Sequence, residues 1–302
     1  MARVLVTGAD GFLGRRLTLA LGARGDGVTA LDLAFGDGAP DADARFAGSV
    51  TDAAAVRSAL RGVDGVIHAA AIADLHAPRG AHDRVNRSGT ETVLAAAEEA
   101  GARVVQVSSY TTLIGRRTHP GDRVGSTPPL PPNALLGAYP ASKRRAEMAV
   151  EAAAARGMPA LSVLPTAPVG PGDHRPTPPG RMILDLAKGA TPALVSTALN
   201  LVDVDALCAG ILRALDCGRP GQRYLLAGED VDLGDLARRV AALTGVRPPR
   251  FRVPMAVALA AAWAEAGIAR WTGHAPAAPL TGVRLAARPV TFDTALAEAD
   301  LG

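Results

Sequence analysis

Short apolar runs alternate with stretches of helical periodicity along the first half of the chain. Residues 2–7 (ARVLVT), 27–33 (GVTALDL) and 63–71 (VDGVIHAAA) are rich in apolar and β-branched residues, which predicts buried strands. The stretches between them, 12–21 and 51–62, have apolar residues at helical spacing and stop at glycines. Strands that alternate with helices in this way predict a parallel sheet with helices on both faces.

The alternation continues as far as residue 165. A helix over 86–101 precedes a strand over 102–109, and a loop over 118–133 then holds five prolines. Another helix and a strand over 159–165 follow. We therefore expect an α/β fold in which residues 1–165 form a Rossmann-type domain, built on a doubly wound parallel sheet.

Residues 166–302 differ from the first half in composition and in the pattern of their elements, which predicts a smaller C-terminal lobe that binds substrate. The segment 166–180 is too rich in proline and glycine for regular structure. An apolar run over 199–205 predicts a strand that returns to the main sheet, and Asp232 is the expected N-cap of the following helix. One of Asp203 and Asp205 is likewise expected to cap the helix after that strand.

A helix over 254–271 has a broad apolar face. Arg and Lys do not line its polar side, so the pattern favours a core helix, or a cover over an apolar pocket, over a membrane-surface helix. The longest uninterrupted apolar run, 255–264, is also far shorter than the roughly 20 residues that span a bilayer.

The composition excludes several classes of protein. The 302 residues are 48% hydrophobic and 20% charged, which predicts a globular chain. The net charge is only +3 and the arginines are interspersed with acids, so we expect no nucleic-acid partner. Cys208 and Cys217 match no metal-ligand spacing, and the first residues lack the anatomy of a signal peptide. We expect a soluble cytoplasmic protein with no metal site and no membrane partner.

The first strand leads into a glycine turn, TGADGFLG, which places glycines at 8, 11 and 14. A strand, a glycine turn and a helix in this order form a dinucleotide-binding unit, in which the helix N-terminus receives the pyrophosphate. The second strand ends in Asp32, whose carboxylate would accept hydrogen bonds from the ribose hydroxyls and repel a 2′-phosphate. These features predict NAD as the cofactor, although Arg15 and Arg16 leave NADP open.

The segment YPASK contains Tyr139 and Lys143, and the chain has only one other lysine, Lys188. Four residues along a helix place the two side chains on one face, as in any solvated surface pair. As a catalytic pair they have a clear chemistry, because a nearby ammonium lowers the pKa of a tyrosine from about 10. Pro140 suits a first helical turn, so Tyr139 would also lie near the positive end of the helix.

Taken together, these motifs resemble the extended short-chain dehydrogenases/reductases. TGADGFLG is similar to their glycine turn and YPASK to their Tyr-x-x-x-Lys pair. Further matches, in family order, are HAAA (68–71), VNRSGTETVLAAA (85–97), VVQVSS (104–109) and PVGPGD (168–173). The matches cover residues 3–175. The second half resembles the subgroup that contains hopanoid-associated sugar epimerases and dihydroflavonol-reductase-like enzymes.

The resemblance implies a role for each matching residue. Tyr139 would be the general acid/base, Lys143 would lower its pKa and hold the nicotinamide ribose, and Ser109 would orient the substrate oxygen. The cofactor-binding residues expected are Gly8, Gly11, Phe12, Leu13, Gly14, Asp32, Ser49, Val50, Ala69, Ala70, Ala71, Asn86, Tyr139, Lys143 and Pro165. Ser49 stands where the family commonly has an aspartate near the adenine, which leaves the backbone amide of Val50 as a contact.

One motif departs from the family spacing, because SSYTTLIG holds one residue more than usual between its serine and its glycine. Alignment on the strand makes Ser109 the catalytic hydroxyl, whereas alignment on Gly115 puts Tyr110 in its place. The strand register and the size of the hydroxyl favour Ser109. Tyr110, Arg181 and Asn200 are the residues expected to contact substrate.

Three functions are consistent with these motifs. An NAD-dependent dehydrogenase or ketoreductase would act on a secondary alcohol or ketone and release the reduced cofactor. A nucleotide-sugar epimerase or dehydratase would recycle it, and a dinucleotide sensor would have lost catalysis. No arginine stands just before Pro165 to clamp a diphosphate, and the apolar 254–271 helix suits a greasy substrate, so the dehydrogenase is favoured. The resemblance also implies a homodimer through the helices over 87–100 and 139–155.

Overall fold

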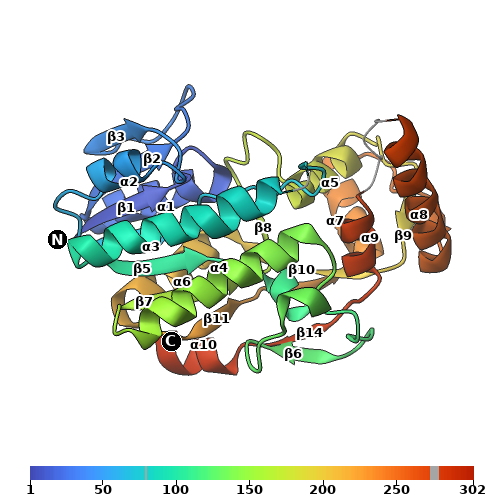
Figure 1. The fold of residues 1–302 in the computed structure, drawn as a ribbon. Helices are drawn as coiled ribbons and strands as arrows, with labels where there is room; N and C mark the ends of the chain where they lie inside the picture. Colours follow the sequence, from blue (N-terminus) through green and yellow to red (C-terminus); the bar gives the residue numbers. More distant parts are fainter. Residues whose placement is uncertain (79, 273–278) are drawn as a thin grey trace.

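Seven parallel strands form the main sheet, in the spatial order β11-β7-β5-β4-β1-β2-β3. The protein is described by a computed structural model that covers residues 1–78, 80–272 and 279–302 (Figure 1). The strands are β1 (Arg3–Thr7), β2 (Gly27–Asp32), β3 (Ala44–Ala47), β4 (Gly65–His68), β5 (Arg103–Val107), β7 (Ala160–Pro165) and β11 (Arg223–Leu226). The order reverses between β1 and β4, so the doubly wound sheet predicted from the sequence is confirmed.

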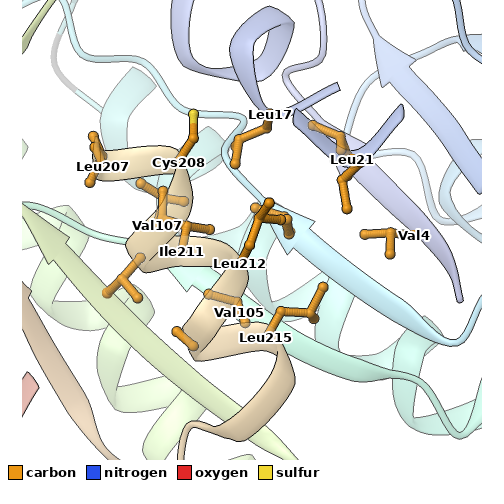
Figure 2. Packing of buried hydrophobic residues seen from close by; sticks show 14 of the residues in the cluster. Val4, Leu17, Leu21, Val105, Val107, Leu207, Cys208, Ile211, Leu212 and Leu215 are labelled. Atoms are coloured by element: carbon orange, nitrogen blue, oxygen red, sulfur yellow. The ribbon is translucent and has the colours of Figure 1, made fainter. Parts of the chain in front are cut away.

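Helices cover both faces of this sheet. One face carries α1 (Phe12–Arg24), α6 (Val204–Cys217) and α10 (Ala295–Leu301), and the other carries α2 (Ala53–Ala59), α3 (Gly89–Ala100) and α4 (Ala138–Ala155). A π-helical turn, η1 (Asp83–Ser88), leads into α3. Figure 2 shows Ile211 and Leu215 of α6 beside Val107 and Val105 of β5, in the same apolar cluster as Leu17 and Leu21 of α1. Each fully buried leucine or isoleucine there contributes roughly 1.5–3 kcal/mol.

The strand predicted over 199–205 does not return to the main sheet, so that prediction is wrong. β10 (Ala198–Asp203) instead lies between β8 (Ala167–Val169) and β12 (Glu229–Asp232) in a separate sheet. The Asn200 side chain fixes it there, because it accepts a hydrogen bond from Gly228 N and donates one to Gly228 O. β11 takes the outer place in the main sheet, and its Tyr224 is fully buried.

The smaller lobe lies at one end of the sheet (Figure 1). Its elements are α5 (Pro178–Ala187), β9 (Ala193–Val195), α7 (Leu233–Thr244), β13 (Phe251–Val253), α8 (Met255–Thr272) and α9 (Leu280–Ala286). The predicted caps are confirmed, since Asp203 accepts from the first turn of α6 and Asp232 from that of α7. None of the helices in the described ranges combines the length and hydropathy needed to cross a bilayer.

Short elements join the lobe to the sheet. They are η2 (Tyr110–Leu113), β6 (Arg123–Gly125), η3 (Pro132–Ala134) and β14 (Thr291–Asp293), and β6 pairs with β14. The helix predicted over 254–271 is present as α8, but Ile268 and Trp271 on its apolar side are exposed. That side is neither core nor pocket cover, contrary to the sequence-based prediction.

Candidate active site

The glycine turn brings β1, α1 and the end of β4 into close contact. Gly8 has a φ of +68°, and a Cβ there would lie 2.8 Å from the Cα of Ala70. A Cβ at Gly14 would lie 2.0 Å from the carbonyl oxygen of Gly8, so neither position accepts a larger residue. Gly11 caps α1 without a side-chain hydrogen bond, which leaves the first-turn N–H groups of Phe12 and Leu13 to bind an anion. The turn therefore fits a dinucleotide pyrophosphate.

Asp32 is held at the carboxyl end of β2. Its carboxylate accepts hydrogen bonds from the backbone N–H of Asp10 (2.8 Å) and of Leu33 (2.7 Å). The two arginines that left NADP open are both engaged elsewhere, since Arg15 pairs with Asp10 and Arg16 with Asp205. An NAD ribose fits a fixed carboxylate in this position, whereas a 2′-phosphate would be repelled by it.

Asp10, inside the glycine turn, has a fully buried side chain and is the centre of an ion cluster. Its carboxylate accepts from Arg15 (2.7 Å), from the backbone of Gly36 (3.2 Å) and from Arg175 (3.0 Å). Burial acts to raise the pKa of Asp10, but these hydrogen bonds and the two arginine charges outweigh it and lower the pKa. Arg175 belongs to the loop before α5, so the cluster ties the lobe to the cofactor turn.

The other predicted cofactor residues lie at the carboxyl ends of neighbouring strands. Ser49 and Val50 follow β3, Ala69 to Ala71 follow β4, and Pro165 ends β7. This edge, beside the point where the strand order reverses, is where open α/β sheets bind their ligands.

His68, at the end of β4, lies at the centre of a buried chain of hydrogen bonds. Thr90 donates to Asn86 O (2.6 Å), so it accepts from His68 Nε2–H (3.0 Å). His68 Nδ1 then accepts from Thr7 (2.7 Å), whose Oγ1 accepts in turn from Ala70 N (3.2 Å). Burial, with the charge of Lys143, lowers the pKa of His68 to about 3, so the imidazole stays neutral.

The chain continues to the helix that carries the catalytic candidates. Asn86 donates from its side-chain amide to Ser142 Oγ (3.0 Å), and Ser142 donates to Tyr139 O (2.8 Å). The path links the end of β1 to the first turn of α4. Its members Thr7, Thr90 and Ser142 were missed at the sequence level. All three stand inside motifs that carry the family resemblance, TGADGFLG, VNRSGTETVLAAA and YPASK.

Ser109, Tyr139 and Lys143 are brought together beyond the carboxyl end of β5. Ser109 follows the strand directly, and Tyr139 lies in the first turn of α4. Burial raises the pKa of Tyr139, and the neighbouring Ser109 hydroxyl opposes that rise. Lys143 is buried and donates from Nζ to Val107 O, 2.7 Å away.

Ser109 and Tyr110, the two candidate hydroxyls, have different surroundings. Ser109 Oγ accepts from Thr111 Oγ1 (3.0 Å), which leaves its own proton free for another acceptor. The Tyr110 ring packs edge-on against Phe292, with ring centroids 5.7 Å apart. Burial, with the charge of Tyr139, raises the pKa of Tyr110 to about 12.

Lys143 does not have the expected effect on Tyr139 in this structure. The pKa of Tyr139 is raised by burial, and the lysine charge is not among the groups that move it. Burial also lowers the pKa of Lys143 itself to about 8, against the opposing charge of Glu147. Both side chains are therefore shifted towards their neutral forms.

A buried ion pair missed at the sequence level supports this site from behind. Glu147, one turn after Lys143 on α4, pairs with Arg223 of β11 at 2.8 Å, and both side chains are almost fully buried. Ser108 donates a hydrogen bond to the same carboxylate. Glu147 thus holds the segment that carries Ser109 against α4.

Two of the three residues predicted to contact substrate lie together in the structure, and the third lies apart. Tyr110 and Asn200 line one small pocket together with apolar residues that include Ile114, Val290 and Phe292. The side-chain amide of Asn200 is hydrogen-bonded to Gly228 and Asp230, which is a structural role. Arg181 is exposed at the start of α5 and is not among the residues that line the pocket.

Within the described ranges, no three His, Cys, Asp or Glu side chains are placed to hold a metal ion. His82 hydrogen-bonds Asp74 O and packs edge-on against Tyr139, with 5.8 Å between the ring centroids.

Comparison with known proteins agrees with this site. The chain is 33% identical over 307 residues to a putative dihydroflavonol 4-reductase of Synechocystis sp., covering 98% of this chain and 88% of that protein. It is 32% identical over 313 residues to 4-hydroxy-2-methyl-3-oxo-4-farnesyl-3,4-dihydroquinoline-1-oxide ketoreductase of Stigmatella aurantiaca, covering 99% and 91%.

Among solved structures, the crystal structure of gox2253 superposes with a TM-score of 0.81 at 32% identity, covering 100% of this chain and 93% of that one. Residues 4–227 match the family model described as "NAD dependent epimerase/dehydratase family". That description agrees with the cofactor expected from the glycine turn and Asp32. The chain therefore belongs to the NAD-dependent epimerase/dehydratase family, whose members have the extended short-chain dehydrogenase/reductase fold.

Proposed function

We propose that the protein is an NAD-dependent oxidoreductase that transfers hydride between nicotinamide and a secondary alcohol or ketone. The observation that carries the proposal is the grouping of Ser109, Tyr139 and Lys143 at the carboxyl edge of the sheet, with Lys143 fixed to the end of β5. A Tyr–Lys pair on a solvated helix surface would be exposed, whereas Lys143 is buried and Tyr139 is partly buried.

Each residue has a role in this reaction. The turn from Gly8 to Gly14 would hold the pyrophosphate of NAD, and Asp32 its adenine ribose. Ser109 orients the substrate oxygen by a hydrogen bond, and Tyr139 exchanges a proton with that oxygen at Oη. NAD supplies or accepts the hydride. A tyrosine whose pKa is raised is protonated at neutral pH, which supports proton donation to a ketone, the reductive direction.

The pocket beside Tyr110 supports an apolar substrate. Most of its side chains are aliphatic or aromatic, and Asn200 is already hydrogen-bonded within the lobe. Arg288 also lines the pocket and is the one cation among the described residues there. The Stigmatella relative is named as a ketoreductase of a farnesyl-bearing quinoline, which is a ketone with a large apolar group.

The proposal predicts that purified protein, given a ketone such as a 2-alkanone and NADH, converts NADH to NAD⁺ in a sustained, stoichiometric manner. Tyr139→Phe should lower kcat/KM by a factor on the order of 10²–10⁴, because it removes the proton donor. Its affinity for NADH should be unchanged. Absorbance of NADH gives the rate, and quenching of tryptophan fluorescence gives the affinity.

Other outcomes would assign other functions. Tightly held NAD that never exchanges, with turnover of a nucleotide sugar instead, would identify an epimerase or dehydratase. Cofactor binding without any turnover, unchanged in Tyr139→Phe, would identify a sensor. Homodimerisation through the outer faces of α3 and α4 is part of the same proposal, and a monomer in light scattering at micromolar concentration would contradict it.

A further inference from the structure

One helix of the lobe turns a continuous apolar face to solvent. At 100° per residue, Val257, Ala261, Ala264, Ile268 and Trp271 of α8 fall on one side of the helix, and all five are exposed. The exposed fractions of Val257, Ile268 and Trp271 are 56%, 60% and 94%. We call these five residues the α8 face. It carries no charged side chain, which is unusual for a fully solvated helix.

The opposite side of α8 fixes this orientation. Ala262 is 3% exposed, and Met255, Leu259 and Ala266 on the same side are partly buried. Figure 1 shows α8 at the extreme end of the lobe, beside α9. The guanidinium of Arg284 on α9 lies over the Trp263 ring, 5.9 Å from its centroid. The α8 face is therefore directed outwards by packing on the other side of the helix.

Two exposed arginines precede this helix. The segment from Leu243 to Thr272 has four arginines and one acidic residue, and Arg252 pairs with Asp232. Arg247 and Arg250, in the loop between α7 and β13, are exposed and form no ion pair within the described part of the chain. Phe251 beside them is 73% exposed.

We propose that the α8 face and its neighbouring arginines dock the protein on the surface of an anionic lipid bilayer. Interfacial helices lie in the membrane plane with the apolar side among the acyl chains and cations near the headgroups. Tryptophans such as Trp271 are suited to the boundary between the two. Arg250 is five residues before the start of α8, hence within about 17 Å of its first turn.

The side of α8 that packs on the lobe is apolar, with Met255, Leu259, Ala262 and Ala266, and would not meet lipid. Arg247 and Arg250, in the loop between α7 and β13, are the exposed cations that would meet the headgroups. This proposal departs from the sequence-based expectation, which was no membrane partner and no membrane-surface helix.

A second copy of the chain is a poorer occupant of the same face. A symmetric dimer that pairs the two α8 helices in parallel would place Arg247 and Arg250 of one protomer near those of the other. That contact would be repulsive, whereas a negatively charged bilayer is complementary to the same arginines. The inference rests on this surface alone and does not depend on the proposed reaction.

Vesicle binding tests the proposal with a built-in reporter. Trp263 and Trp271 are the two tryptophans of the chain, and both lie on α8. The full chain should co-sediment with vesicles of phosphatidylcholine mixed with phosphatidylglycerol at least tenfold more strongly than with phosphatidylcholine alone. Its tryptophan emission should shift to the blue, and brominated acyl chains should quench it. Added salt should weaken binding.

Two sets of variants separate the apolar and ionic parts of the surface. Ile268→Glu with Trp271→Glu, and Arg247→Glu with Arg250→Glu, should each lower binding at least tenfold while circular dichroism and thermal unfolding stay unchanged. Leu19→Glu is the matched control, because Leu19 is a half-exposed leucine on α1, away from the lobe. It should bind like the parent.

Several results would overturn the proposal. One is a folded parent protein that fails to bind the anionic vesicles, and another is binding that survives both sets of variants. A dimer in solution that Ile268→Glu with Trp271→Glu dissociates would show that a second copy occupies the face. NADH turnover in vesicle-free buffer reports separately on the catalytic site, so failure of one proposal is distinguishable from failure of the other.

Discussion

At the scale of single residues, burial shifts Tyr139 and Lys143 in the same chemical sense, towards their neutral forms. The pKa of the tyrosine is raised and that of the lysine is lowered to about 8. A neutral tyrosine is ready to give up a proton, and a lysine with a pKa near 8 still carries its charge over most of the neutral range. The site therefore favours reduction at neutral pH. The charge of Lys143 is lost as the pH rises above about 8.

The pH dependence of ketone reduction should report that lysine. Lys143 is protonated below its pKa, so kcat/KM should be constant at lower pH and fall about tenfold per unit as the pH rises beyond about 8. Lys143→Met should be slow and lose this descending limb. Lys188→Met is the control, because Lys188 is exposed at the end of α5 and should leave the profile unchanged. A limb that persists in Lys143→Met would assign it to another group.

A second residue-scale prediction separates the two candidate hydroxyls. Ser109→Ala should lower kcat/KM about a hundredfold, because it removes a hydrogen bond to the reacting oxygen. Tyr110→Phe should change it less than about threefold, since the Tyr110 ring packs on Phe292. The reverse order of effects in steady-state kinetics would favour the alignment on Gly115.

At the scale of secondary-structure elements, the buried chain through His68 joins β1, β4, α3 and α4. Every donor in it has one acceptor, which leaves the imidazole with a single tautomer. Protonation of His68 would break the chain, and the low pKa of the histidine prevents that at any pH where the protein functions. The geometry of the glycine turn and of the Tyr139 turn is thus insensitive to pH.

The chain predicts an unequal cost for two threonines on α3. Thr90 and Thr92 each donate to a backbone carbonyl four residues earlier, but only the bond of Thr90 is buried and shared with His68. Thr90→Val should lower the free energy of unfolding by about 1–3 kcal/mol, because it leaves a buried N–H without an acceptor. Thr92→Val should change it by less than about 0.5 kcal/mol. Urea unfolding measures both, and equal losses would contradict a special role for the chain.

The elements also show where prediction from sequence succeeds and where it fails. Residues 12–21 and 102–109 were recognised because amphipathic and apolar periods are local properties of the chain. The competing strands over 199–205 and 223–226 are both short apolar runs, so local pattern does not tell which one joins the main sheet. The decision is made by distant partners, above all the pairing of Arg223 with Glu147, 76 residues earlier.

At the scale of the whole molecule, the two sequence halves interpenetrate more than a boundary at residue 165 implies. β11, α6 and α10 come from the second half and complete the Rossmann domain. The residues predicted to be catalytic or to bind cofactor do lie together at one sheet edge, because motif order and strand ends can be read from the sequence. The apolar pocket and the outward face of α8 were not predictable, because both depend on which lobe elements pack together.

The whole-molecule feature with the plainest kinetic consequence is the ion pair between Arg175 and Asp10. Asp10 N holds the carboxylate of Asp32, so a residue of the lobe braces the group that would bind the adenine ribose. Arg175 is 68% exposed, which limits the strength of the pair to about 0.2–1 kcal/mol. An ion pair of this strength would slow the dissociation of a bound cofactor without preventing it.

The residence time of NADH should therefore depend on this one exposed arginine. Stopped-flow dissociation should be faster in Arg175→Ala by a factor of about 1.4–5, as expected for 0.2–1 kcal/mol. Arg181→Ala, which removes another exposed arginine of the same lobe, should leave it unchanged. High salt should hasten release from the parent protein but hardly from Arg175→Ala. How long the cofactor stays, and hence how readily the enzyme exchanges it, is then set by a contact outside the Rossmann sheet.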